Sequence, residues 1–330
     1  MNRISALEEL GFERVEPASP ASEEALPGRD HCRVLTVRPA MGTLVSVVAL
    51  HPSGARAEDA VEEAFAEMDR LVGVLSRHDS SSPVAHLNRC GRLGDAPPEL
   101  AQVVGRALDY HRLTAGAFDI TVEPLVGLFE AATRPPGPAE VAEVRELVGA
   151  EHLKLAGRRL SFERSGMGIT VDGIAKGAIV DAMAELLGSR GVRDFLINAG
   201  GDIRASGLKE NGQPWTVAVR DPSNRDAFVD VVRATNGAVA TSGDYEKEYR
   251  HLVSTETGRS PERSRSVSVM APSAVAADAL ATALFVMEPA RAGRLARSVP
   301  SCGSLVRDGQ GRSVRSEGWT RARMKVVEHE

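Results

Sequence analysis

Two oxygen-bearing side chains lie four residues apart in an alanine-rich segment near the end of the chain. Asp278 and Thr282 belong to the run Ala-Asp-Ala-Leu-Ala-Thr, and side chains at this spacing share one face of a helix. A carboxylate and a hydroxyl without a neighbouring His or Cys favour a hard cation, magnesium or calcium, over zinc. The structural alternative is an acid stabilised by the dipole of a helix N-terminus and a threonine bonded back to a carbonyl.

A second candidate is the segment 171–177, Val-Asp-Gly-Ile-Ala-Lys-Gly. We expect a glycine-containing turn to enter a helix here, and the free N–H groups and dipole at a helix start favour a phosphate. Lys176 adds a positive charge within an apolar stretch. The segment lacks the spacing of the Walker and dinucleotide-binding loops, so a plain strand–turn–helix junction with an exposed lysine is the alternative.

Three further loops combine small residues with an acid: Gly116–Asp119, Asn198–Asp202 and Thr241–Tyr245, the last followed by His251. Small residues let the backbone approach a ligand closely, and the acids are able to bind a ribose, a ring nitrogen or a metal-bound water. The alternative for each loop is a turn whose Asp or Ser caps its own backbone. For His251 the alternative is a surface histidine.

Hydrophobic spacing predicts the elements that hold these residues. Residues 34–50 read as two strand segments interrupted at Met41-Gly-Thr, and residues 56–74 as a helix. Further helices are predicted at 98–114, from the Pro-rich break at 135–138 to about 148, at 175–190 and at 274–287. A strand pair is predicted near 152–163, and single strands at 192–198, 214–220, 228–240 and 265–271. Because strands and helices do not alternate regularly, we predict an α+β architecture and not a doubly wound Rossmann sheet.

Composition excludes several classes of function. A formal net charge of −5 and a pI near 6.0 argue against a nucleic-acid partner. No apolar run approaches the roughly 20 residues that a membrane-spanning helix needs, and the first 33 residues are acidic and polar, so we expect a cytoplasmic protein. The three scattered cysteines suggest neither a disulfide framework nor a zinc site.

Taken together, these segments resemble one family, the ApbE-type FAD:protein FMN transferases. The resemblance covers about residues 36–310, which implies one large ApbE-like, T-fold-like domain at 34–318 between a mobile lead-in at 1–33 and a tail at 319–330. The matching motifs are Met41–Thr43, Ser76 through Leu87-Asn88, Gly116–Leu125, Asp172–Gly177 with Asp181, Asn198–Asp202, Trp215, Thr241–Asp244, His251 and Ala277–Thr282.

The resemblance implies a Mg²⁺ site formed by Asp278, Thr282 and the backbone carbonyl of Gly173. It also implies a catalytic role for Asp278 and for His251 as general base, because His251 is the titratable group best suited to that role near neutral pH. By the same resemblance, the FAD site is lined by Met41, His78, Ala117, Phe118, Asp119, Thr170, Lys176, His251 and Leu252.

The activity that the resemblance implies is transfer of FMN from FAD to a Thr or Ser hydroxyl of an acceptor flavoprotein, with release of AMP. A Mg²⁺-dependent FAD pyrophosphatase, in which water replaces the hydroxyl, is the nearest alternative, and a non-catalytic FAD-binding protein is a third. The identity of the acceptor and the oligomeric state do not follow from the sequence.

Three departures from the family pattern bear on FAD affinity and substrate preference more than on the reaction class. The segment from His251 to Gly258 lacks the acid and the proline that commonly follow the histidine. An aromatic residue is common where this chain has His78, and an aspartate is common where it has Thr170.

Overall fold

The computed structural model describes residues 22–25, 31–243, 252–261 and 265–324. Within these ranges, nine strands form one sheet in which every neighbouring pair is antiparallel. In spatial order they are β1 (Ser22–Ala25), β2 (Cys32–Ala40), β3 (Thr43–His51), β7 (Asp194–Ala199), β8 (Asp202–Ser206), β11 (Gly237–Gly243), β12 (Ser266–Ala271), β13 (Gly303–Arg307) and β14 (Ser313–Arg315). The predicted α+β architecture is confirmed, since a Rossmann sheet is mostly parallel.

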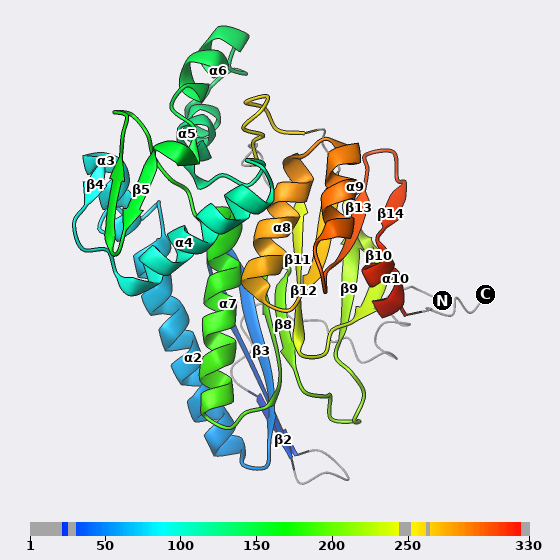
Figure 1. The fold of residues 1–330 in the computed structure, drawn as a ribbon. Helices are drawn as coiled ribbons and strands as arrows, with labels where there is room; N and C mark the ends of the chain where they lie inside the picture. Colours follow the sequence, from blue (N-terminus) through cyan, green and yellow to red (C-terminus); the bar gives the residue numbers. More distant parts are fainter. Residues whose placement is uncertain (1–21, 26–30, 244–251, 262–264, 325–330) are drawn as a thin grey trace.

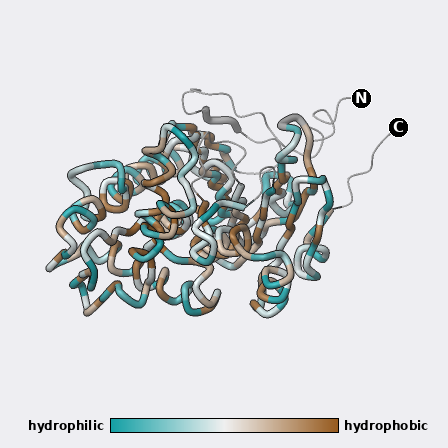
Figure 2. The backbone as a smooth tube through the Cα atoms, turned by 90° about the horizontal axis from the view of Figure 1, so that it is seen from above, coloured by the Kyte–Doolittle hydropathy of each residue, from teal (hydrophilic) through white to brown (hydrophobic). Residues whose placement is uncertain are grey.

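Three long helices cover one face of this sheet (Figure 1): α2 (Gly54–Leu75), α7 (Asp172–Ser189) and α8 (Ala274–Val286). Alternate side chains of β3, Val45, Val47 and Ala49, join the core beneath these helices, whereas Leu50 joins a second core on the opposite face. The alternation follows from the two-residue period of a strand. Along the chain, hydrophobic and hydrophilic positions accordingly alternate at short intervals (Figure 2).

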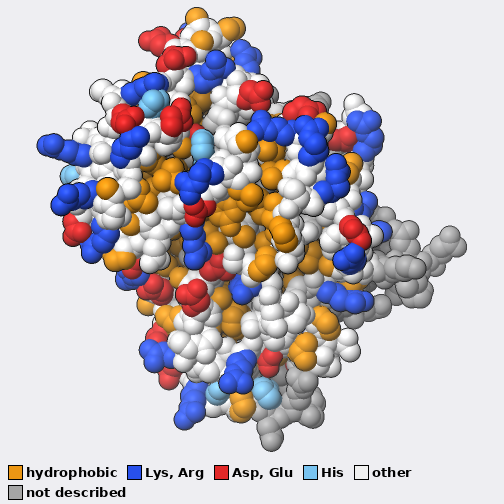
Figure 3. All heavy atoms as spheres, in the orientation of Figure 1, with side chains coloured by type: hydrophobic (Ala, Val, Ile, Leu, Met, Phe, Trp, Pro, Cys, Tyr) orange, Lys and Arg blue, Asp and Glu red, His pale blue; other side chains and the backbone are white. Residues whose placement is uncertain are grey.

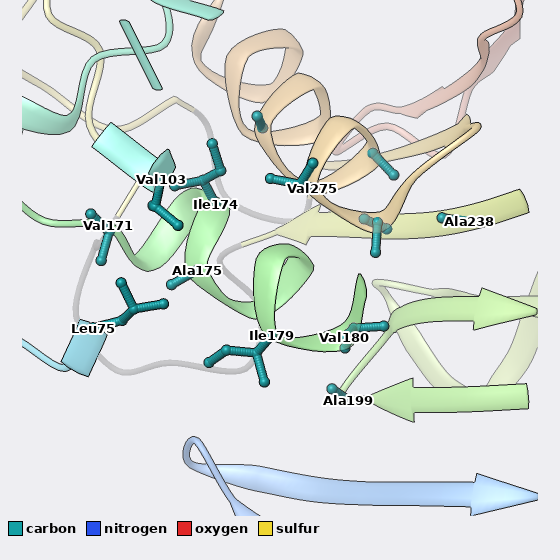
Figure 4. Packing of buried hydrophobic residues seen from close by; sticks show 14 of the residues in the cluster. Leu75, Val103, Val171, Ile174, Ala175, Ile179, Val180, Ala199, Ala238 and Val275 are labelled. Carbon is teal, nitrogen blue, oxygen red and sulfur yellow. The ribbon is translucent and has the colours of Figure 1, made fainter. Parts of the chain in front are cut away.

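Helix α7 is apolar on nearly all sides because it lies between the sheet and the neighbouring helices. Its residues Ile174, Ile179 and Val180 point in different directions, Ile174 lying beside Val103 of the segment 98–113 and Val180 near Ala199 of β7 (Figure 4). Helix α8 is built largely from alanine, and its small side chains allow close packing against α7. Apolar side chains also gather near the centre of the face shown in Figure 3, with charged side chains around them.

A two-stranded antiparallel sheet, β9 (Thr216–Asp221) and β10 (Asn224–Arg233), packs on the opposite face through the second core. Helix α10 (Glu317–Ala322) closes this core with Trp319, which is 0% exposed and donates from Nε1 to Asp230 at 3.0 Å. Arg315 and Arg323 also bind the Asp230 carboxylate. The predicted boundary between domain and tail, at residue 318, therefore falls inside a helix that belongs to the core.

The remaining elements lie mainly between α2 and α7 in sequence. A three-stranded antiparallel sheet has the order β4–β6–β5. These elements are α3 (Pro83–Cys90), β4 (Arg92–Leu93), α4 (Pro98–Leu113), η1 (Ile120–Val122), α5 (Glu123–Ala131), α6 (Pro138–Arg145), η2 (Ala150–His152), β5 (Leu153–Ala156) and β6 (Arg159–Phe162), and α9 (Pro289–Ser298) follows α8.

Some predicted elements differ from the structure. The single strand predicted at 228–240 is wrong, because β10 ends at Arg233 and β11 begins at Gly237 in a different sheet. Asn236, with φ of +50°, reverses the chain between them. The helix predicted at 175–190 begins three residues earlier, at Asp172. Strand β1 lies within the segment predicted as a lead-in and pairs with β2.

Within the described ranges, no helix combines the length and the apolar character that a membrane crossing requires.

Helices α7 and α8 lie close together at Gly177. A Cβ atom added there would lie 2.5 Å from the Ala274 carbonyl oxygen and 2.8 Å from the Val275 Cα. Both obstacles are backbone atoms, which do not rotate away as a side chain does. Only glycine therefore fits at this crossing.

Replacing Gly177 with Ala should force the two helices apart and lower the free energy of unfolding by about 1–3 kcal/mol, the usual cost of overpacking. Chemical denaturation of wild type and variant measures the difference. The matched control is Gly188→Ala in the same helix, where an added Cβ meets nothing within 4 Å and the helix should gain about 0.5–1 kcal/mol. Equal effects at the two positions would contradict the packing argument.

Candidate active site

One cavity of about 670 Å³ lies where α7 and α8 meet the ends of several strands, a volume typical of small-molecule and cofactor sites. Every predicted site residue within the described ranges lines it: Met41, His78, Ala117, Phe118, Asp119, Thr170, Gly173, Lys176, Leu252, Asp278 and Thr282. His251 lies outside the described residues. A second cavity, of about 740 Å³, is lined by α4, α7 and β8 and contains none of these residues.

The three oxygen donors predicted for a metal come together in this cavity. Thr282 lies against Gly173, where an added Cβ would be only 3.1 Å from the threonine Oγ1. Asp278, one helical turn earlier, is 4% exposed, and one of its oxygens accepts the Gly177 N–H at 3.0 Å. The hydroxyl oxygens of Ser242, near the end of β11, and Thr282 lie 3.3 Å apart.

The charge of Asp278 is poorly compensated. Burial, with a smaller contribution from the Asp202 carboxylate, raises the pKa of Asp278 to about 8, although Lys176 and the Gly177 N–H act in the opposite direction. A buried carboxylate of this kind is stabilised by a cation. An oxygen-only set of carboxylate, hydroxyl and carbonyl fits a hard divalent cation such as Mg²⁺. In the part of the chain that the structure describes, no group of three His, Cys, Asp or Glu residues is placed to hold a metal.

Lys176 lies in the second turn of α7, inside the helix and not in the loop before it. Its ammonium forms an ion pair with Asp202, whose side chain is 2% exposed at the start of β8. Burial lowers the pKa of Lys176, but the carboxylates of Asp202 and Asp278 outweigh that effect and raise it above its ordinary value. Lys176 is therefore a permanent cation in the cavity, suited to binding phosphate and not to accepting a proton.

Met41 reaches the cavity from the hairpin that joins β2 and β3. Met41 and Gly42 have φ values of +51° and +71°, and Ala40 pairs with Thr43, as in the two-residue turns that match the twist of paired strands. A positive φ is strained for methionine, and such strain recurs at ligand sites. The turn places Met41 and Thr43 at the cavity wall.

Residues 117–119 of the turn at 114–119 line the cavity, and the side chains of Phe118 and Asp119 are buried. Phe118 is 2% exposed and meets Tyr110 edge to face, with ring centroids 6.2 Å apart. Asp119 accepts hydrogen bonds from the N–H and the hydroxyl of Thr121 and from the Ala150 N–H. The Asp119 carboxylate thus caps its own turn, which is the structural alternative considered for this loop.

The segment after His251 is held firmly despite its departure from the family pattern. Leu252 and Val253 are buried, and Val253 packs against α5 and α6 in a small separate core. Thr255 donates from its hydroxyl to the Gly116 carbonyl at 2.9 Å, and Arg145 donates to the Glu256 carbonyl at 2.8 Å. These bonds join the segment to the 114–119 turn and to α6.

Residues 41–305 match the model of the ApbE family. The chain belongs to the ApbE family. It is 33% identical over 270 residues to the FAD:protein FMN transferase of Vibrio cholerae, covering 76% of this chain and 80% of that one. It is 30% identical over 277 residues to the FAD:protein FMN transferase of Salmonella typhimurium, covering 78% and 79% of the two chains.

Solved structures agree with this assignment. The flavin transferase ApbE from Vibrio cholerae superposes with a TM-score of 0.76 at 28% identity, over 92% of this chain and all of that one. The ApbE protein from Thermotoga maritima superposes with a TM-score of 0.79 at 28% identity, over 89% of this chain and all of that one. The family resemblance seen in the sequence is confirmed.

Arg77 lies beside this ApbE-family site, between the lining residues Ser76 and His78, and the sequence did not predict it. Its side chain is 6% exposed beside His78, and it donates to Asp172 at the start of α7 at 2.9 Å and to Glu130 in α5 at 3.0 Å. Asp172 directly precedes Gly173, so Arg77 joins the start of α7 to α5. No local pattern reveals this, because the partners lie 95 and 53 positions away in the sequence.

Replacing Arg77 with Met should lower the free energy of unfolding by about 1–3 kcal/mol, because two partly buried carboxylates lose their cation. Arg70→Met is the matched control, since Arg70 also binds two carboxylates, Glu67 and Glu99, but is 48% exposed, where such pairs contribute about 1 kcal/mol or less. Urea denaturation compares the variants, and a larger loss for Arg70 would refute the assignment.

His111 makes a pH-dependent contact with Asp119, in the turn at 114–119. The nearby Asp119 carboxylate, 3.3 Å from Nδ1, is the main reason that the pKa of His111 is raised above 6.5, against a smaller opposing effect of burial. A raised pKa stabilises the fold fully below pH 6.5 and loses that effect as pH rises through the folded-state pKa. The stability gap between wild type and His111→Gln should therefore shrink as pH rises. Urea denaturation of both proteins, from below pH 6.5 to above the folded-state pKa, measures this difference in stability. A difference that grows as pH rises would contradict a raised pKa for His111.

Proposed function

We propose that this protein catalyses the Mg²⁺-dependent transfer of FMN from FAD to a Thr or Ser hydroxyl of an acceptor flavoprotein, with release of AMP. The observation that carries the proposal is that segments far apart in the sequence supply one cavity with three oxygen donors and a permanent cation. The similarity of this chain to the FAD:protein FMN transferases of Vibrio cholerae and Salmonella typhimurium also supports this proposal.

The cation would be held by Asp278, Thr282 and the Gly173 carbonyl. When bound, it supplies positive charge to the pyrophosphate and lowers the barrier to breaking the bond between the two phosphates. Lys176, released in part from Asp202, contributes a second positive charge from the neighbouring turn of α7. Lys176 would neutralise part of the charge that develops on the leaving phosphate.

The reaction balances without a further reactant. The acceptor hydroxyl oxygen bonds to the phosphorus of the FMN half, the bond from that phosphorus to the bridging oxygen breaks, and AMP leaves with the bridging oxygen. The hydroxyl proton passes to a base, and we propose that this base is His251. The cytoplasmic location expected from the sequence stays a prediction.

Incubation with FAD and Mg²⁺, with and without a Thr-containing acceptor, tests the proposal. Transfer predicts AMP together with an acceptor whose mass increases by that of bound FMN. AMP formed at the same rate without acceptor, and no labelled acceptor, would identify a pyrophosphatase. Tight FAD binding with no AMP in either reaction would identify a carrier.

Asp278→Asn should reduce Mg²⁺-dependent AMP release by more than roughly 100-fold, because the only carboxylate ligand loses its charge while its shape is kept. Isothermal titration should show weaker Mg²⁺ binding in parallel. Asp181→Asn is the control, because Asp181 also accepts backbone N–H groups, those of Ala274 and Val275, but does not line this cavity. If Asp278→Asn bound Mg²⁺ as tightly as the wild type, Asp278 would not be a metal ligand.

A further inference from the structure

One edge of β9 is not paired with any strand in the described ranges, and this edge lines the candidate active site. β9 and β10 form a sheet of two strands. The far edge of β10 is covered at Val231, where the Met324 N–H donates to the Val231 carbonyl at 2.8 Å. On the β9 side, residues 217–220 line the cavity that also contains Lys176 and Asp278.

The register of the ladder shows which peptide groups point toward the open edge. Paired residues in an antiparallel ladder alternate between pairs that bond to each other and pairs whose N–H and C=O groups point outward. Ala234 donates to the Trp215 carbonyl across the ladder, and Val231 pairs with Ala218 three positions further along. Because the Val231 carbonyl bonds outward to Met324, the peptide groups of Ala218 point outward on the opposite side.

The open edge is short and firmly supported. Val217 and Val219 are each 4% exposed in the second core, which fixes the strand on both sides of Ala218. At one end, Lys209 donates from Nζ to the Thr216 hydroxyl at 2.8 Å. At the other end, the exposed Arg220 brings a positive charge to the cavity wall.

We propose that this edge docks the acceptor protein: an extended acceptor segment adds to β9 as a third strand, pairing with the N–H and C=O of Ala218. The proposal rests on the proposed function. Strand addition supplies affinity through main-chain bonds, and the two-residue period of the added strand directs alternate side chains to opposite faces. One such side chain is the target Thr or Ser, which enters the cavity, and an acidic side chain lies near Arg220.

The occupant follows from continuity with the reaction site and from charge. A protein substrate has to bring a hydroxyl into a cavity that also holds FAD, and a single extended strand is the thinnest form of polypeptide that makes specific main-chain bonds. The open edge and the oxygen donors line the same cavity. Arg220 adds a positive charge that complements an acidic segment.

Ala218→Pro tests the docking directly, because proline removes the outward N–H and leaves the bonds that Val217 and Val219 make to β10. Proline is tolerated at such edge positions. Short peptides with a single central Thr serve as acceptors, chosen from a library as those that the wild type labels with FMN. In this variant we expect the KM for the peptide to rise roughly 3- to 10-fold, which corresponds to the loss of one backbone hydrogen bond. The KM for FAD should rise by less. Ala218→Val keeps the N–H and should keep most of the peptide affinity.

A second measurement uses wild-type protein and does not depend on the variant folding. Peptides N-methylated at one residue at a time should lose labelling at alternate positions, as expected for an added strand. Uniform loss or no loss along the peptide would overturn the docking proposal, and so would a larger change in KM for FAD than for peptide. AMP release without any labelled peptide would also overturn it, whereas absence of AMP release would contradict the proposed function itself.

Discussion

The close crossing of α7 and α8 is the constraint on which the site depends. At Gly177 the backbone of α8 occupies the space of a side chain, and the Gly177 N–H binds Asp278. The first turns of α7 carry Gly173 and Lys176, so the same crossing brings a carbonyl and an ammonium beside the Asp278–Thr282 face. A wider crossing would separate these groups without changing any of them.

The buried charges at this crossing support the proposal that it forms a site and does not serve packing alone. Asp278 and Asp202 place two carboxylates almost out of contact with solvent, beside the ammonium of the partly exposed Lys176, and buried carboxylates are costly unless they are paired. Lys176 pairs with Asp202, which leaves Asp278 with a raised pKa. An apolar crossing of the same shape would be easier to stabilise, and the proposed cation would compensate the Asp278 carboxylate.

Sequence patterns predicted those parts of the site that depend on local spacing. The four-residue separation of Asp278 and Thr282 on one helix face and the turn at Met41-Gly-Thr are properties of short segments. Arg77 escaped prediction because its ion pairs join distant segments. The break between β10 and β11 had a local signal in Asn236-Gly237, a typical turn pair, but the β-branched residues on both sides concealed it. The open edge of β9 depends on which strands pair, and no local pattern encodes that.

The most direct test of the account is the position of a bound cation. Crystals grown with FAD and Mn²⁺ in place of Mg²⁺ would locate the metal by its anomalous scattering. The account predicts a peak bonded to the Asp278 carboxylate, the Thr282 Oγ1 and the Gly173 carbonyl, at roughly 2.0–2.2 Å, beside the pyrophosphate. A metal bound elsewhere in the cavity, with Asp278 and Thr282 bonded only to protein, would contradict it.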